Sequence, residues 1–283
     1  MAELVGGALA RIRSKYPLMT NTERKIADKI FSSHKETIVS SVGIMARRCH
    51  VSESSIIRFS QTLGYSGFGE LKIALAQDLS QVTTAMDLTE GIEKNPVSAI
   101  DFIARASELA IQDTIELLDR DAFMKAVSCM ANADKVHFYG FGSSGDSAIS
   151  AKHIFLRIGL NADCFTDNHY VTAACNLGPR DVAVAISRTG NAEDAVYSLR
   201  LAQVNRATTM CITCSLDSEI TQYADYVLLA GTGMPPGNSQ LLLGRMAELL
   251  VINALFLGVA ITKDKWHEEL LPSKTTPGSP GSF

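Results

Sequence analysis

The chain has 283 residues, of which 46% are hydrophobic and 20% are charged, and its formal net charge is −4. This is the composition of a globular protein long enough for two domains, and it excludes a disordered or collagen-like chain. The sequence has no run of about 18 uncharged apolar residues, and its N-terminus, which carries Glu3, lacks the pattern of a signal peptide. We therefore expect a cytoplasmic protein without a membrane partner.

Charge is divided unevenly along the chain. Residues 1–80 carry a net charge of +4, whereas residues 81–283 carry −8. A basic segment beside an acidic one favours a polyanionic partner for the first segment only. Solvated basic faces are common, so charge alone does not establish such a partner.

Residues 1–79 are predicted to form an all-α domain, because apolar residues recur at helical spacing from Tyr16 to Leu79. Ser52, with Glu53 in the first turn, is a favourable N-cap, and Gly64 is a natural stop. The expected helices begin near Thr22, span 41–48 and 52–63, and run from Ser66 to Leu79. The two middle helices, joined by a tight turn, predict a helix-turn-helix motif.

The third of these helices would place its N-terminal residues at base edges in a DNA major groove. Ile56, Phe59 and Leu63 should face inward, which leaves a polar outer side. An arginine there can bond guanine O6 and N7 together. The candidate base-reading residues are Ser54, Ser55, Arg58, Gln61 and Thr62, and the candidate phosphate contacts are Arg47, Arg48 and Lys72. A plain helical bundle with a solvated polar face is the alternative.

After residue 79 the pattern changes twice. Residues 80–120 are expected to be a linker followed by a lead-in helix from about Val97 to Leu118. From Lys135 onward, strand-like runs alternate with helices, which predicts an α/β domain over 121–271 with a doubly wound, parallel, five-stranded sheet. The strands are expected at 135–139, 162–166, 182–187, 208–214 and 226–230, and a long apolar helix at 239–257. Residues 272–283, rich in Pro, Gly, Ser and Thr, are predicted to be a disordered tail.

Two loops of similar chemistry follow neighbouring strands. Gly140–Gly145 contains Gly142, Ser143 and Ser144, and Ser187–Asn191 contains Arg188, Thr189 and Gly190. Both lie where ligands of open α/β sheets bind, and a helix N-terminus there attracts an anion. The pair of loops favours a phosphorylated ligand.

The first loop also matches G-x-G-x-x-G, with Asp167 about twenty residues further on, as in dinucleotide-binding folds. Two adjacent serines and the second loop suit a compact phosphate monoester as well, so a redox role is the weaker reading. Cys211 and Cys214 have C-x-x-C spacing, but they lie in a strand-like run with no second pair nearby. We predict buried reduced thiols, no metal site and no cofactor.

The residues from Thr20 to Leu79 resemble the helix-turn-helix of RpiR-type bacterial transcriptional regulators, through the stretches Val51–Phe59 and Leu63–Phe68. Residues from about Asp121 to Ala260 resemble the SIS (sugar isomerase) domain, through the two loops. The resemblance implies a regulator that binds operator DNA and senses a phosphorylated sugar.

In SIS domains the loop hydroxyls hold the phosphate, which implies this role for Ser143, Ser144, Ser187 and Thr189, with Gly142 and Gly190 beside them. Thr189 replaces the usual second serine of the Ser-x-Ser-Gly loop. Arg188 is an unusual charge inside that loop and is a candidate ligand contact.

A sugar-phosphate isomerase is the alternative function, because isomerases also use SIS domains. Aldose–ketose isomerisation needs a positioned base, and Glu248, His153 and His169 are the candidates. We expect packing or surface roles for the two histidines. Glu248 is expected to pair with Arg245 or to bind a sugar hydroxyl. A basic helix-turn-helix has no evident use in an enzyme, so no enzymatic activity is predicted.

A homodimer or a dimer of dimers is expected, because two-fold operators reflect two-fold proteins. The apolar helix at 239–257 and the lead-in helix are the expected contact surfaces.

Overall fold

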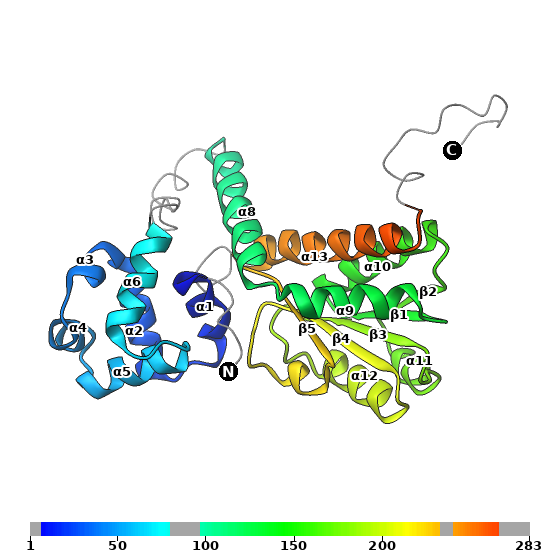
Figure 1. Ribbon diagram of the computed structural model, residues 1–283, viewed down its shortest axis with the longest axis horizontal. Coiled ribbons are helices and arrows are strands. Elements are labelled where there is room, and N and C mark those ends of the chain that lie inside the picture. Colours follow the sequence, from blue (N-terminus) through cyan, green and yellow to red (C-terminus); the bar gives the residue numbers. More distant parts are fainter. Residues whose placement is uncertain (1–6, 80–96, 233–239, 266–283) are drawn as a thin grey trace.

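The computed structural model describes residues 7–79, 97–232 and 240–265, and it contains a helical unit followed by an α/β unit (Figure 1). The predicted fold class is therefore confirmed. The predictions for residues 80–96 and for the tail at 272–283 lie outside the described residues.

The helical unit contains more helices than the sequence pattern indicated. Its elements are α1 (Ala8–Lys15), a 3-10 turn (Tyr16–Leu18), α2 (Asn21–Ser32), α3 (His34–Val39), α4 (Val42–Cys49), α5 (Glu53–Thr62) and α6 (Phe68–Leu79). We did not predict α1 and α3, which are eight and six residues long. The N-cap of α2 is Thr20, which forms a capping box with Glu23.

The turn of the helix-turn-helix is defined by two local features. His50 ends α4 in the left-handed conformation, with φ 54°, and the Ser52 hydroxyl accepts a hydrogen bond from the Ser55 N–H at 3.2 Å. The predicted N-cap role of Ser52 is thus confirmed. Ile56, Phe59 and Leu63 are buried, as expected, and fix the orientation of α5 against the other helices.

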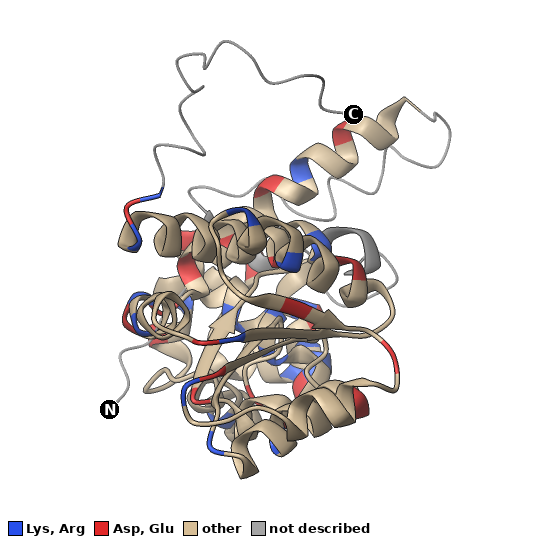
Figure 2. Cartoon of the chain, turned by 90° about the vertical axis from the view of Figure 1, so that its right-hand side faces the viewer, with Lys and Arg blue, Asp and Glu red and all other residues tan. Residues whose placement is uncertain are grey.

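The α/β unit has a five-stranded sheet in the order β2-β1-β3-β4-β5, and every neighbouring pair is parallel. The strands are β1 (Val136–Gly140), β2 (Ala162–Phe165), β3 (Val182–Ile186), β4 (Thr208–Thr213) and β5 (Tyr226–Leu229). Most strand positions are uncharged, and Lys, Arg, Asp and Glu gather on helices and loops (Figure 2). Central strands of this kind are buried on both faces, as β3 is throughout.

Helices cover both faces of the sheet. α9 (Arg120–Ala131), α10 (Ser143–Arg157) and α13 (Gln240–Thr262) lie on one face, and α11 (Tyr170–Cys175) and α12 (Glu193–Val204) on the other (Figure 1). A further helix, α8 (Ser98–Leu117), and a short 3-10 helix, η3 (Glu219–Tyr223), complete the unit. α9 was not predicted.

The segment Gly244–Thr262 of α13 is long and apolar enough to cross a membrane by length and composition alone. In the structure, however, Val251, Leu255 and Val259 are fully buried in the main core of the α/β unit. The segment also carries Arg245 and Glu248. These contacts identify α13 as a core helix of a globular domain.

Helix α1 joins the two units. The Arg13 guanidinium forms a bidentate ion pair with the Asp113 carboxylate of α8, in which Arg13 Nε lies 2.7 Å from Asp113 Oδ2. Both side chains are almost completely buried. On the same side, Ala10 packs with Leu117 and Leu229 of the α/β unit. Leu9 and Ile12 belong to the core of the helical unit. One eight-residue helix therefore contributes to the packing of both units.

Arg13→Met is expected to lower the free energy of unfolding by about 3–5 kcal/mol, because it leaves the buried Asp113 carboxylate without its guanidinium. The exposed pair Arg180–Asp134 supplies the control, and Arg180→Met should cost about 1 kcal/mol or less. Urea titration followed by circular dichroism measures both. Equal costs for the two variants would contradict a structural role for the buried pair.

Candidate functional site

The loop after β1 leads directly into α10. Gly142 is the N-cap of that helix, with φ 57°, a conformation that favours glycine. At Gly140 a side chain is excluded, because a Cβ would lie 2.4 Å from the Ser144 carbonyl oxygen. Ser143 and Ser144 therefore lie in the first turn of α10, rather than in the loop before it. The N–H of Ser144 bonds the Phe141 carbonyl at 3.2 Å.

The loop after β3 is held by close packing. Gly190 has φ 69°, and a Cβ there would lie 1.8 Å from the Ser218 hydroxyl. Ser187 is buried, and its carbonyl accepts the Gly190 N–H at 3.0 Å. Thr189 is exposed, and its hydroxyl accepts the Asn191 N–H at 3.3 Å. Since β1 and β3 are paired neighbours, both loops leave the same edge of the sheet.

Arg188 bridges the two loops. Its Nη2 donates to the Ser143 hydroxyl at 3.2 Å and lies 3.9 Å from Glu248 Oε1, while its stem lies against Gly244 of α13. The Arg188 side chain is only 11% exposed, and its Nε is buried without a hydrogen-bond partner among the described residues. A buried donor left unpaired favours an acceptor such as a phosphate oxygen.

Glu248 forms the floor of this arrangement and is completely buried. It accepts hydrogen bonds from the hydroxyls of Ser144, at 3.1 Å, and Ser147, at 2.7 Å. The expected pair between Glu248 and Arg245 is wrong, because the Arg245 guanidinium bonds Asp146 at 3.0 Å instead. Ser147 was missed by the sequence reasoning, although it lies one turn after Ser143 and Ser144 on the same helix.

The predicted loop residues are thus placed together, with two kinds of surroundings. Ser143 and Thr189 are exposed, whereas Ser144 and Ser187 are buried. The Ser144 hydroxyl already donates a hydrogen bond to Glu248. The ligand roles of all of them, and of Gly142, Gly190, Arg188 and Glu248, remain predictions.

A hollow of about 350 Å³ lies over the N-terminal half of α12, and its chemistry differs from that of the two loops. It is lined by Tyr170, Glu193, Asp194, Val196, Tyr197, Arg200, Glu219 and Tyr223. Three carboxylates against one guanidinium disfavour a phosphate there. The two loops remain the better anion site.

Apart from Glu248, the residues considered for isomerase or redox chemistry do not assemble around the loops. His153 is exposed on α10, and the exposed His169 ring lies 3.1 Å from Asp167. Burial raises the pKa of both the Cys211 and Cys214 thiols to about 12. These cysteines are therefore buried neutral thiols at physiological pH, as we expected.

On the helical unit, the outer side of α5 carries the predicted base-reading residues. Ser54, Arg58, Gln61 and Thr62 are exposed, and Ser55 is half-buried. The hydroxyls of Ser54 and Ser55 each lie 2.8 Å from the Ser52 hydroxyl. Ile57 was missed, although it lies beside Arg58 and is 40% exposed. An exposed isoleucine in this position is suited to contact a thymine methyl group.

The predicted phosphate contacts have different local partners. Arg47 is exposed on α4. Arg48 pairs with Glu36 at 2.9 Å, and Lys72 donates to the Ser40 carbonyl at 3.0 Å. To bind a DNA phosphate, Arg48 would have to release Glu36 or contact both groups, and Lys72 would have to do the same with the Ser40 carbonyl.

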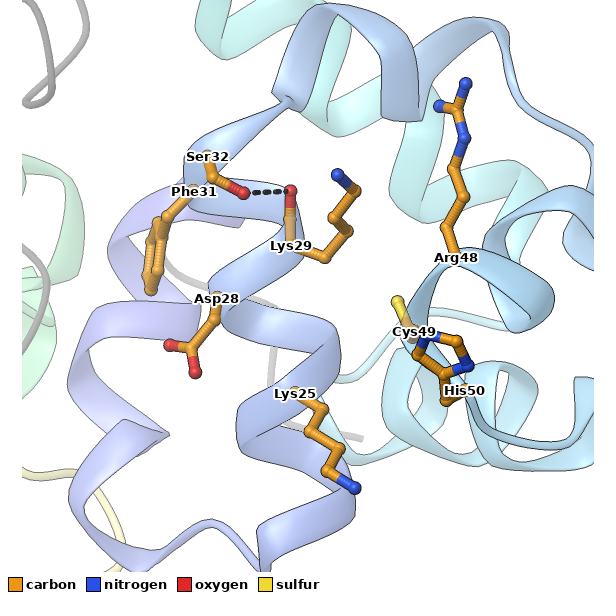
Figure 3. A pocket seen from close by; sticks show the side chains of 8 residues that line it. All are labelled: Lys25, Asp28, Lys29, Phe31, Ser32, Arg48, Cys49 and His50. Carbon is orange, nitrogen blue, oxygen red and sulfur yellow. Dashed lines mark hydrogen bonds between the residues drawn. The ribbon is translucent and has the colours of Figure 1, made fainter.

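A hollow of about 620 Å³ between α2 and the end of α4 adds further basic residues (Figure 3). Lys25 and Lys29 of α2 face Arg48 and His50 across it, with Asp28 as the only acidic residue among those that line it. The sequence contains the signal for this site, a Lys pair at i, i+4 on an amphipathic helix, but it does not indicate which helix lies opposite.

Comparison with known proteins identifies both units. Residues 6–82 match the family model for the helix-turn-helix domain of the rpiR family, and residues 129–258 match that for the SIS domain. An HTH-type transcriptional regulator of Caldanaerobacter subterraneus is 35% identical over 90% of this chain and 91% of its own length. A regulator of the same type from Haemophilus influenzae is 32% identical over 89% of both chains. The chain belongs to the RpiR family of transcriptional regulators.

A further relative and two solved structures are also similar to this chain. The Escherichia coli regulator RpiR is 26% identical over 90% of this chain and 86% of its own. The structure of Vibrio vulnificus NanR, which was solved with ManNAc-6P, matches 93% of this chain and 96% of its own with a TM-score of 0.57 and 23% identity. A Listeria monocytogenes structure described as a putative sugar-phosphate isomerase matches 62% of this chain and 98% of its own, with a TM-score of 0.54 and 21% identity. At these identities the structural matches establish the fold only.

Proposed function

We propose that this RpiR-family regulator binds operator DNA through α5 and that a phosphorylated sugar, bound at the loops after β1 and β3, modulates its operator affinity. The observation that carries the proposal is Arg188, which joins two loops bearing hydroxyls and whose buried Nε has no hydrogen-bond partner among the described residues. A cation surrounded by hydroxyl donors at the carboxyl edge of a parallel sheet suits a phosphate monoester.

The ligand-binding set that we propose combines Ser143, Thr189 and Arg188 as direct phosphate contacts. The buried Ser144 and Ser187 support the loops from below, and Glu248 accepts hydrogen bonds from α10 hydroxyls. ManNAc-6P, the ligand named for NanR, is one member of this chemical class. We propose no cofactor, no metal, no catalysis and a cytoplasmic location.

Catalysis is disfavoured by the surroundings of Glu248, the best-placed carboxylate. A general base must reach the proton that it removes, directly or through one water. Both oxygens of Glu248 are occupied by serine hydroxyls, and the side chain is wholly buried. Direct assay of aldose–ketose isomerisation on sugar phosphates tests this alternative.

A homodimer or a dimer of dimers is expected in solution, because the exposed side of α8 carries a stripe of apolar side chains that no other described residues cover. Ile100 is 71% exposed and Ile115 is 49% exposed, with Ile103 and Ile111 between them. Their spacing places them along one face of the helix, and a second copy of α8 would cover it. Static light scattering at micromolar concentration measures the mass, and a monomer would contradict this expectation.

Arg58→Ala should weaken binding to the operator by about 1–3 kcal/mol, if Arg58 pairs with a guanine, and should weaken binding to random DNA less. Arg48→Ala, as a phosphate-contact control, should weaken binding to all sequences alike and reduce the salt slope by about one unit. Fluorescence anisotropy at several salt concentrations gives both. If Arg58→Ala affects operator and random DNA equally, Arg58 does not read bases.

The double variant Ser143→Ala, Thr189→Ala should fold normally and bind the operator as wild type does, because both hydroxyls are exposed. Each lost hydrogen bond to a charged phosphate contributes about 1.5–3 kcal/mol, so sugar-phosphate affinity should fall roughly tenfold or more per hydroxyl. A thermal-shift titration measures the affinity, since ligand binding to the native state raises the melting temperature.

Ser150→Ala, two turns further along α10, is the matched control and should bind the ligand as wild type does. An unchanged thermal shift in the double variant would place the phosphate elsewhere.

A further inference from the structure

Regulation by a ligand requires a physical connection between the sugar-phosphate loops and α5. The inference about this connection rests on the function proposed above. Allosteric coupling needs a structural element with two arrangements. Ligand binding at each of the two sites must shift the equilibrium between these arrangements. The described residues contain one continuous set of contacts from the loop after β3 to the C-terminal end of α5.

The first step joins the loop after β3 to the loop after β4, residues 214–218. The Cys214 N–H donates to the Arg188 carbonyl at 3.0 Å, and the Ile220 N–H donates to the Gly190 carbonyl at 2.9 Å. Gly190 also packs so closely on Ser218 that no Cβ fits. A shift of Arg188 and its neighbours therefore moves the 214–218 loop with it.

The second step joins the 214–218 loop to α1. The Leu216 N–H donates to the Ser14 hydroxyl at 3.2 Å, and Asp217 Oδ2 lies 2.8 Å from Lys15 Nζ. The Ser215 hydroxyl in the same loop is fully buried and lacks a hydrogen-bond partner among the described residues. A buried hydroxyl without a partner costs free energy in the present arrangement of the loop.

The third step joins α1 to the DNA-reading helix. Lys15 Nζ donates to the Thr62 carbonyl at 3.0 Å, and Arg11 Nη1 donates to the Leu63 carbonyl at 3.4 Å. Positive charge at the last carbonyls of a helix stabilises its C-terminus. The Lys15 ammonium thus contacts the α/β unit and the end of α5 simultaneously, with only 19% of the side chain exposed.

We infer that Lys15 is the coupling residue of this regulator: it links the 214–218 loop, through Asp217, to the Thr62 carbonyl, so that ligand at the loop after β3 changes the position of α5. Binding free energies are reciprocal. Operator binding must therefore change the affinity for the ligand by the same factor as the ligand changes the affinity for the operator.

Two variants divide this path. Lys15→Met removes both contacts of the ammonium, whereas Asp217→Asn removes only the ion pair to the α/β unit. Lys263→Met is the matched control, because Lys263 Nζ also donates to a helix-end carbonyl, that of Ala131 at 2.8 Å, far from the path. All three substitutions leave the residues of both proposed binding sites in place.

The first readout is the operator dissociation constant with and without effector. The probe DNA is a duplex selected from a random library by the wild-type protein, and the effector is the sugar phosphate that gives the largest thermal shift. A coupling ratio of about five- to 150-fold is typical. We expect Lys15→Met and Asp217→Asn to bring this ratio at least threefold closer to one with unchanged thermal shifts, and Lys263→Met to keep it.

The second readout needs no effector. Hydrogen exchange of residues 214–220 is measured with and without the selected duplex. We expect the duplex to change exchange there in wild type and in Lys263→Met, and not in Lys15→Met. An unchanged coupling ratio in Lys15→Met, or no exchange difference in wild type bound to the duplex, overturns the inference while leaving the proposed function intact. Failure of the wild type to select any duplex overturns the proposed function first, and this inference with it.

Discussion

The arrangement of the whole molecule depends on the buried ion pair between Arg13 and Asp113. Each of these buried charges has lost its hydration by water, and the ion pair with the opposite charge compensates for that loss. The pair fixes α1 on α8, and α1 in turn contributes Leu9 and Ile12 to the core of the helical unit. The position of α5 relative to the loops after β1 and β3 is therefore set by one short helix.

A second buried carboxylate organises the α/β unit. Glu248 enters the sheet edge from α13 and ties the first turns of α10 to the core through Ser144 and Ser147. Arg188 lies 3.9 Å away and turns toward Ser143. This combination places the Arg188 guanidinium beside an exposed hydroxyl at the carboxyl edge of the sheet, although the unit as a whole is acidic.

The two units divide the chemistry in a way that matches the family. The helical unit presents exposed polar residues and Ile57 on α5, and it has basic residues around the hollow of Figure 3. The α/β unit presents glycine-rich loops that admit no side chain at Gly140 or Gly190. Each feature by itself is common, but their presence on one chain, joined through α1, is what a ligand-controlled DNA-binding protein requires.

The sequence by itself determined the features that are local. Hydrophobic period and turn residues determined the helix-turn-helix, the Ser52 cap and the five parallel strands, because these depend on neighbours a few residues apart. The positions of the loop glycines and hydroxyls could likewise be predicted from the sequence, since these residues directly follow predicted strands.

Only the tertiary structure decided which distant groups meet. It paired Arg13 with Asp113, turned Arg188 onto Ser143, gave Arg245 to Asp146 instead of Glu248, and placed Lys15 against both Asp217 and Thr62. Charged side chains are long and have many possible partners along a sequence, and only packing of the surrounding helices selects one of them. The short α1, which the sequence pattern did not predict, supplies both Arg13 and Lys15 to these pairings.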